Sequence, residues 1–248
     1  MSQDPAGPTL GMLDWGIGGC SVLAALQAHG VGCRVLYASD SGAPPYGKLT
    51  STALAVRVQQ VAEELMARGA QQVVVACNAA STVCARIPLP LLSVIDAGVQ
   101  EIRAKGYSRV AVLGGRRTIE SQAYVAALPE VEVIQRVAQP LSALVEAGQL
   151  QGPAVRAAVV EVISGLPKVD ALVLACTHYP ALAPHFAALL PGVPLVDPGV
   201  ALAQGLAKGL APGKVQARFF TSGDPASMRA AALAAFGVEI QSVESLLC

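Results

Sequence analysis

The sequence predicts an α/β protein with two similar α/β domains, each built on a mostly parallel sheet and facing the other across a cleft. Three observations predict this fold: short apolar runs alternate with segments of helical period, landmarks recur roughly 100 residues apart, and the composition can fill a large core. Of the 248 residues, 53% are hydrophobic and 14% are charged. Soluble domains average about 25% charged residues, so this chain is unusually apolar.

Charge and residue order exclude several classes of protein. The 17 Lys and Arg residues equal the 17 Asp and Glu residues, and no basic run exceeds Arg116-Arg117, so we expect neither nucleic acid nor an anionic membrane as a partner. Polar residues, Gly or Pro interrupt each apolar stretch before the roughly 20 residues that a membrane-spanning helix needs. Because Met1–Pro5 shows no leader pattern, we expect a soluble cytoplasmic protein with free thiols.

Apolar runs mark the predicted strands, and amphipathic segments between them mark helices. In the helix expected over Ser51–Arg68, residues such as Leu54, Val58 and Val61 lie on one face. The other helices considered are Ala154–Ser164 and Ala181–Leu190. The predicted strands are Leu10–Leu13, Val35–Ala38, Val73–Ala76, Leu91–Ile95, Val110–Leu113, Val131–Val133, Ala171–Ala175 and Pro194–Val196.

The chain also repeats itself. Val73–Cys77 recurs as Leu172–Cys176, and Leu92–Val99 recurs as Val193–Val200. The offset of the cysteines is 99 (176 minus 77), and the Asp residues of the second pair are 101 apart (197 minus 96). Since ligands of parallel sheets bind beyond the carboxyl ends of the strands, the repeat predicts a cleft with one thiol on either wall.

Cys77 and Cys176 are the strongest candidates for chemistry. Cys77 follows a predicted strand and precedes Asn78 at the start of a helix, a position expected to lower a thiol pKa. After Cys176, Thr177 offers a hydroxyl, and His178 can exchange protons near neutral pH. The remaining cysteines are assigned to packing or to the surface: Cys20, Cys33, Cys84 and Cys248.

Alternatives stay open for the individual residues. His178 suits a proton-transfer assistant or a helix cap, and a zinc site with Cys77 and Asp14 would need paired-ligand spacings that are absent, so no metal is expected. Asp14, at a strand end before the glycines of Gly16–Gly19, either receives an ammonium group or caps a helix.

Two further positions have an ordinary alternative. Tyr46 and Gly47, in a turn, have groups that suit a carboxylate, although tyrosines in turns are commonly surface residues. Glu146 by itself looks like a helix-end charge. The Gly16–Gly19 stretch is not a dinucleotide fingerprint because Ser21 stands where a glycine is required.

Two thiols across a cleft suit the removal of a proton from an α-carbon and its return on the opposite face. One thiol must then be deprotonated while the other is protonated, and polarisable thiols can switch near neutral pH. A redox disulfide is the main competing chemistry, but its usual Cys-Xaa-Xaa-Cys spacing is absent. Acyl transfer by a thiol nucleophile is the other alternative.

In combination, the motifs resemble glutamate racemase, within the cofactor-independent aspartate/glutamate racemase superfamily. The resemblance runs from about residue 10 to the C-terminus, and two cysteine motifs at this separation make it specific. The matching segments are Asp14–Gly19, Pro45–Gly47, Ala76–Asn78, Thr118–Ser121, Val145–Gly148, Cys176–Pro180 and Thr221–Pro225.

The resemblance implies a first α/β domain of residues 1–98 plus 211–248 and a second of residues 99–210. It also implies inversion of glutamate without a cofactor, D-glutamate supply for peptidoglycan, and a homodimer. Cys77 matches the base for the D-enantiomer and Cys176 the base for the L-enantiomer. Acid–base assistants match Asp14, His178 and Glu146, and substrate contacts match Tyr46, Gly47, Asn78, Thr118 and Thr177.

Two departures from the family pattern concern the substrate. Trp15 stands where the family has Ser, and Ala79 stands where it has Thr. Each removes a hydroxyl from a substrate-contacting position, which costs about tenfold or more in binding. A racemase or epimerase acting on another substrate, or a non-catalytic ligand-binding paralogue, are therefore the alternatives to a glutamate racemase.

Overall fold

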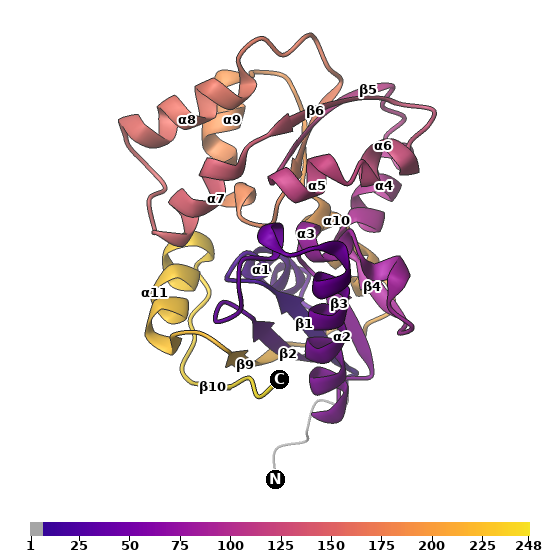
Figure 1. Cartoon of the computed structure of the whole chain (residues 1–248), viewed down its shortest axis with the longest axis vertical. Coiled ribbons are helices and arrows are strands. Elements are labelled where there is room, and N and C mark those ends of the chain that lie inside the picture. The colour runs from indigo at the N-terminus through magenta and orange to yellow at the C-terminus, as the bar shows by residue number, and fades with distance from the viewer. Residues whose placement is uncertain (1–6) are drawn as a thin grey trace.

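The computed structural model describes residues 7–248 and contains two separate parallel sheets, each at the centre of one lobe (Figure 1). The first sheet has the order β10-β9-β2-β1-β3-β4 and the second has the order β6-β5-β7-β8. The first sheet comprises β1 (Thr9–Asp14), β2 (Cys33–Ser39), β3 (Gln72–Val75), β4 (Leu91–Ser93), β9 (Val215–Thr221) and β10 (Val243–Ser245). The second comprises β5 (Arg109–Gly114), β6 (Glu132–Val137), β7 (Ala171–Ala175) and β8 (Leu195–Val196).

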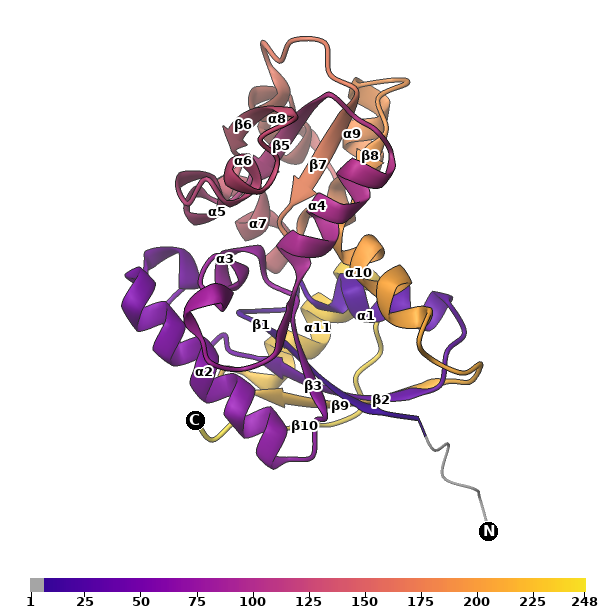
Figure 2. The ribbon, with the colours of Figure 1, turned by 90° about the vertical axis from the view of Figure 1, so that its right-hand side faces the viewer.

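Helices cover both sheets, and Figure 2 shows the two lobes joined along one side where α4 and α10 lie together. The α-helices are α1 (Cys20–Ala28), α2 (Ser51–Ala67), α3 (Asn78–Ser81), α4 (Val94–Ala104), α5 (Arg116–Glu120), α6 (Ala123–Ala127), α7 (Gln139–Glu146), α8 (Pro153–Ile163), α9 (Ala183–Leu189), α10 (Pro198–Ala207) and α11 (Pro225–Phe236). Short 3₁₀ helices are η1 (Tyr46–Lys48), η2 (Cys84–Arg86) and η3 (Tyr179–Leu182).

The internal repeat predicted from the sequence is confirmed by the topology. The order β2-β1-β3-β4 of the first lobe is the same as the order β6-β5-β7-β8 of the second. Cys77 follows β3 and Cys176 follows β7, so both thiols lie just beyond the carboxyl end of the third strand of their repeat. The α/β fold with mostly parallel sheets is therefore as predicted.

The C-terminal segment extends the first sheet beyond the repeat. β9 pairs with β2 and β10 pairs with β9, both in parallel. We keep the division into residues 1–98 plus 211–248 and residues 99–210 as a proposal that accords with this pairing. Met1–Pro5, where no leader was expected, lies outside the described residues.

The boundaries that differ have local causes. The predicted strand Leu91–Ile95 is too long because the Ser93 side chain accepts hydrogen bonds from the backbone of Ile95 and Asp96 and starts α4. The predicted Val131–Val133 strand is displaced to β6, an edge strand that contains charged residues. The predicted helix Ala181–Leu190 is split between η3 and α9.

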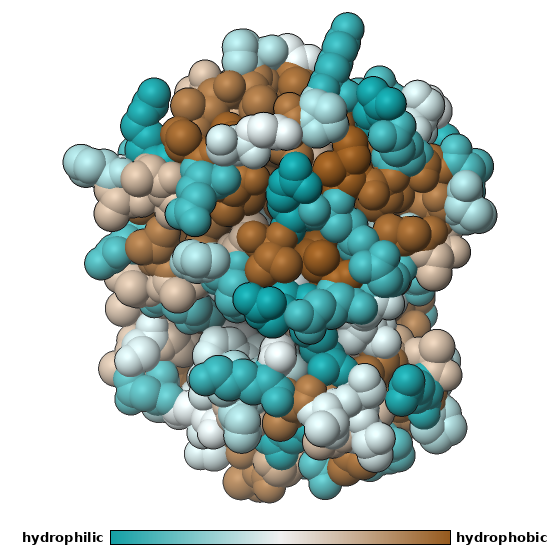
Figure 3. Space-filling view, turned by 45° about the horizontal axis from the view of Figure 1, so that its top comes forward, coloured by the Kyte–Doolittle hydropathy of each residue, from teal (hydrophilic) through white to brown (hydrophobic). Residues whose placement is uncertain are grey.

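Two strands were not predicted, and the cysteines are as expected. β9 begins with alternating exposure and β10 is only 3 residues long, so neither shows a continuous apolar run. All six cysteines are free. Hydrophobic side chains on the face seen in Figure 3 lie in several areas separated by polar ones. Within residues 7–248, no helix has both the length and the apolar character needed to cross a membrane.

Candidate active site

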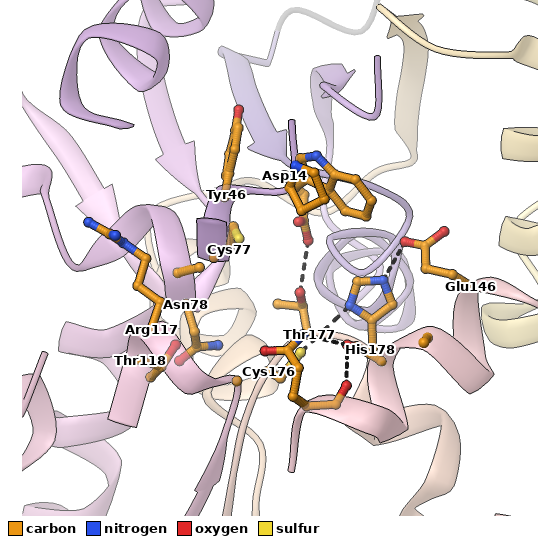
Figure 4. Close-up of a pocket in the computed structure, with 18 of the residues that line it drawn as sticks. Asp14, Tyr46, Cys77, Asn78, Arg117, Thr118, Glu146, Cys176, Thr177 and His178 are labelled. Atoms are coloured by element: carbon orange, nitrogen blue, oxygen red, sulfur yellow. Dashed lines mark hydrogen bonds and ion pairs between the residues drawn. The ribbon is translucent and has the colours of Figure 1, made fainter. Parts of the chain in front are cut away.

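A pocket of ≈ 580 Å³ lies between the two lobes, and every site residue predicted from the sequence lines it (Figure 4). Strand ends of both sheets supply its walls, as expected for parallel sheets. From the first lobe come Asp14, Trp15, Tyr46, Gly47, Cys77, Asn78 and Ala79. From the second come Thr118, Glu146, Cys176, Thr177 and His178.

Asp14 and Thr177 connect the two lobes across the pocket. Asp14 ends β1 and is only 1% exposed, and its Oδ2 accepts a hydrogen bond of 2.8 Å from the Thr177 hydroxyl. Gly18 makes this approach possible, because a Cβ there would lie 2.4 Å from Thr177 Oγ1. A buried carboxylate is thereby held at the pocket wall by a neutral donor.

Cys176, His178 and Glu146 form a chain of polar contacts. The Cys176 Sγ lies 3.6 Å from His178 Nδ1, and His178 Nε2 lies 2.5 Å from Glu146 Oε1. Glu146 Oε1 also accepts a hydrogen bond of 3.2 Å from the backbone N–H of Ile17 in the other lobe. Gly16 leaves the space, since a Cβ there would lie 2.1 Å from the same oxygen.

This chain shifts the pKa of two of its members. Burial would lower the pKa of His178, but its hydrogen bonds to Cys176 and Glu146 outweigh burial and raise the pKa well above 6.5. Burial likewise opposes ionisation of Glu146, yet the hydrogen bond and charge of His178 bring its pKa below the usual 4.5. The pair is therefore an imidazolium and a carboxylate, and an imidazolium N–H faces the Cys176 sulfur.

Cys77 has a different environment, and one expectation about it is wrong. The residue does precede helix α3, but it is 8% exposed, and burial followed by the negative charge of Asp14 raises its pKa well above 9.0. The helix has 4 residues, so its dipole is too weak to offset desolvation. Cys77 therefore holds its proton.

Asn78 and Tyr46 are buried in the pocket wall, so Tyr46 is not the exposed turn residue of the ordinary alternative. The Asn78 Oδ1 accepts a hydrogen bond of 3.0 Å from the Tyr124 hydroxyl, and the Asn78 Nδ2 has no partner. The Tyr46 hydroxyl donates to Asp40 Oδ2 at 2.9 Å. Arg57 Nε donates to the same oxygen at 2.7 Å. Because the Tyr46 hydroxyl proton is donated to Asp40, it is not free to bind a ligand.

Trp15 and Ala79 lie at the pocket, so the two departures from the family pattern affect its lining. The Trp15 indole N–H donates to the Ala43 carbonyl oxygen at 3.1 Å. Because this donor is used, the indole offers the pocket an apolar ring, and Ala79 offers a methyl group where a hydroxyl was expected. Hydrogen bonds to a ligand must therefore come from the other polar side chains of the pocket.

Sequence reasoning missed Arg117, which also lines the pocket. From α5 its guanidinium donates to Leu49 O, Ser51 Oγ and Thr82 Oγ1 of the other lobe at 2.6, 3.0 and 3.2 Å. Burial, followed by the charge of Arg86, lowers its pKa. The loop after β5 repeats the loop after β1, and this correspondence was the available signal. The pocket is also lined by residues that were not predicted as site residues: Pro45, Lys48, Gly115, Gln139, Ser142, Ala143, Ala147 and Ala175.

Comparison with known proteins identifies the class. A profile of the Asp/Glu/Hydantoin racemase family matches residues 21–206. The glutamate racemase of Ectopseudomonas mendocina is 34% identical, over 93% of this chain and 94% of that protein. The glutamate racemase of Gloeobacter violaceus is 32% identical over 90% of both.

Solved structures agree with the sequence comparison. The glutamate racemase of Thermus thermophilus in complex with β-chloro-D-alanine has a TM-score of 0.86 and 29% identity, covering 98% of both chains. That of Francisella tularensis in complex with D-glutamate has a TM-score of 0.85 and 26% identity, covering 97% of both chains. Fold and site thus define an isomerase of the racemase class. The chain belongs to the Asp/Glu/Hydantoin racemase family and is similar to glutamate racemases.

Proposed function

We propose that this protein interconverts L- and D-glutamate with Cys176 and Cys77 as the two proton-transfer groups. The observation that carries the proposal is that both thiols line one pocket from equivalent strand ends of opposite lobes, in unlike environments. Cys176 has the His178 imidazolium 3.6 Å away, which suits a thiolate, whereas the raised pKa keeps Cys77 protonated. A two-base inversion requires one thiol to accept a proton while the other donates one, and the unlike environments of Cys176 and Cys77 support this division of roles.

The reaction follows from these roles. The Cys176 thiolate takes the α-proton of L-glutamate, so that the Cα–H bond breaks and its electron pair delocalises into the α-carboxylate. The Cys77 thiol then gives its proton to the opposite face of Cα, forming D-glutamate and leaving a Cys77 thiolate. The reverse direction begins from that form. Asn78 Nδ2, a buried donor without a partner, suits an oxygen of the substrate α-carboxylate.

Asp14 suits the substrate ammonium because it is a buried carboxylate at the pocket wall. The glutamate racemase of Francisella tularensis was solved in complex with D-glutamate, and the likeness to it supports glutamate as the substrate of this chain. We further propose that the enzyme works in the cytoplasm as a homodimer, without a cofactor, and supplies D-glutamate for peptidoglycan.

Deuterium exchange tests the proposal. In D2O, the purified protein is expected to exchange the α-proton of glutamate and to invert it, followed by NMR and polarimetry. Cys77→Ala and Cys176→Ala should each abolish inversion and retain one-sided exchange at most, whereas Cys84→Ala, at a cysteine outside the pocket, should leave the rate unchanged. Racemisation at the parental rate in either of the first two variants would refute the two-thiol mechanism.

One observation favours a substrate other than glutamate: the indole of Trp15 lies at the pocket. An apolar ring in place of a hydroxyl suits an amino acid whose side chain packs against it. The double change Trp15→Ser, Ala79→Thr should raise kcat/KM for glutamate about tenfold if the two departures weaken glutamate binding. An unchanged or lower kcat/KM for glutamate would mean that the two departures do not limit it.

A further inference from the structure

Tyr124 makes a contact between the lobes that involves the pocket. It lies in α6 of the second lobe and is fully buried, and its hydroxyl donates to Oδ1 of Asn78 in α3 of the first lobe at 3.0 Å. Asn78 directly follows Cys77 in the chain and lines the pocket. Tyr124 itself does not line the pocket, so any effect it has on a ligand passes through Asn78.

The contact determines which end of the Asn78 amide is free. A tyrosine hydroxyl has one proton, and among residues 7–248 Asn78 Oδ1 is the only acceptor within hydrogen-bond distance of it. Turning the amide over would leave that proton without an acceptor in a buried site. The Tyr124 pKa is raised by burial, so the hydroxyl keeps its proton. The amide oxygen is therefore fixed on Tyr124.

The other end of the amide, Nδ2, is buried and makes no hydrogen bond. Figure 4 shows the Asn78 amide nitrogen turned toward the side of the pocket where Cys176 lies. Buried donors are nearly always paired in native proteins, and an amide N–H is complementary to a carboxylate oxygen. The unpaired Nδ2 thus indicates a ligand acceptor beside Cys77, a role that a carboxylate oxygen fits.

The neighbours of Tyr124 leave its hydroxyl little freedom to move. In α4, a Cβ at Gly98 would lie 3.1 Å from the Tyr124 hydroxyl oxygen and 3.0 Å from the Pro198 side chain. Glycine at this position therefore provides the space that the hydroxyl occupies. The hydroxyl therefore lies against α4, which packs on α10 where the lobes join.

We propose that Tyr124 is a positioning residue, whose hydroxyl orients the Asn78 amide so that Nδ2 donates to a carboxylate oxygen of the substrate. This proposal rests on the proposed function for the identity of the substrate. The proposal goes beyond the proposed function because Tyr124 determines that the Asn78 amide presents its N–H donors to the ligand. A carboxylate oxygen is therefore favoured over a hydrogen-bond donor at that position. Opening the cleft would break the contact and release the amide.

Kinetics of Tyr124→Phe give the first test. The ring that packs in the core is kept, and only the hydroxyl is lost. Because Asn78 is expected to bind the substrate and the transition state alike, KM for glutamate should rise about tenfold while kcat changes less than about twofold. In the Asn78→Ala background, the same substitution should change KM less than about twofold. Equal effects of Tyr124→Phe in both backgrounds, or an unchanged KM, would overturn the proposal.

Asn78 is the only asparagine of the chain, which allows a direct observation. With ¹⁵N in the asparagine side-chain amide, the free protein should give one pair of amide proton signals, and D-glutamate should shift them. Tyr124→Phe should change these signals in the free protein, before any ligand is added. Signals indifferent to Tyr124→Phe would refute the positioning role even in a variant too unstable for kinetics. An effect of Tyr124→Phe without any response to glutamate would instead refute glutamate as the substrate.

Discussion

At the scale of single residues, the two thiols differ because of what surrounds them. Cys77 is buried beside the negative charge of Asp14, whereas Cys176 is half-buried beside an imidazolium. The sequence placed both at equivalent strand ends, but the order of the residues carries no information about relative desolvation. Cys77 is buried in a core cluster that segments distant in the chain build together, such as β1, α2 and β9, so its raised pKa became apparent only in the folded structure.

Alkylation by iodoacetamide should distinguish the two thiols. Because thiolates react and thiols do not, and burial raises the pKa of Cys77 well above 9.0, Cys77 is expected to be modified at least about tenfold more slowly than Cys176 at pH 7.5. Peptide mass spectrometry measures both rates in the same sample, and exposed Cys248 serves as an internal reference. D-glutamate should slow modification of Cys176 and leave Cys248 unaffected. Faster modification of Cys77 would contradict the raised pKa of this thiol.

The ion pair of His178 and Glu146 should make stability depend on pH. The folded pKa of His178 is raised, so its contribution is fully present below about pH 6.5 and is lost as the pH rises through the folded pKa. The folded pKa of Glu146 is lowered, so its contribution is present above about pH 4.5 and is lost as the pH falls through the folded pKa. The pair therefore stabilises the protein most between these two values.

Thermal unfolding of Glu146→Gln across pH 4 to 9 measures this contribution. The loss relative to the parent protein should be about 1–3 kcal/mol between about pH 4.5 and 6.5, and should become smaller on either side. Glu130→Gln is the control, because Glu130 pairs with Arg103 at the exposed surface. A loss that stays constant from pH 6 to 9 would show that the ion pair is not its source.

At the scale of elements, the glycine stretch after β1 has a role that its sequence suggested only in part. The Ile17 N–H within this stretch donates to the carboxylate of Glu146. Gly16 and Gly18 additionally admit side chains of the opposite lobe. Ile17 and Glu146 are 129 residues apart in the chain. A local sequence pattern does not reveal a contact over such a separation.

Gly16→Ala should therefore disconnect Glu146 from His178. The added Cβ would lie 2.1 Å from Glu146 Oε1, so the carboxylate must move, and kcat/KM for glutamate is expected to fall about tenfold or more. Gly205→Ala is the matched control, because a Cβ at this position in α10 meets nothing within 4 Å. Steady-state kinetics and melting curves of both variants provide the comparison, and parental activity in Gly16→Ala would contradict the role given to the loop.

Prediction from sequence succeeded for elements whose signal is continuous. The buried strands β1, β3, β5 and β7 appear as apolar runs, and the repeat predicted two similar halves with a thiol at an equivalent strand end of each. β9 and β10 were not predicted because they lie at or next to the edge of the sheet. β9 begins with alternating exposure, and β10 is short. Arg117 was missed for another reason: in the short helix α5, only its place in the internal repeat distinguishes it from a surface arginine.

At the scale of the whole molecule, hydrogen bonds between the two lobes hold the cleft closed, and they come from several helices, strands and loops. Asp14 pairs with Thr177, Ile17 with Glu146, and Asn78 with Tyr124. Each of these contacts involves a pocket residue, so closure of the lobes and assembly of the site are the same event. Arg117 adds three hydrogen bonds to the first lobe. Their acceptors lie just after η1, at the start of α2 and just after α3.

Arg117→Met should open the cleft without disturbing either lobe. Its guanidinium has no carboxylate partner in residues 7–248, and its three bonds all cross between lobes, so the loss falls on their relative position. Alkylation of Cys77 is expected to accelerate about fivefold to tenfold, because each lost hydrogen bond weakens closure by about 0.5–1.5 kcal/mol. Arg103→Met, which removes an exposed ion pair within the second lobe, should leave that rate unchanged. Equal alkylation rates in both variants would mean that the remaining contacts, and not Arg117, keep the lobes together.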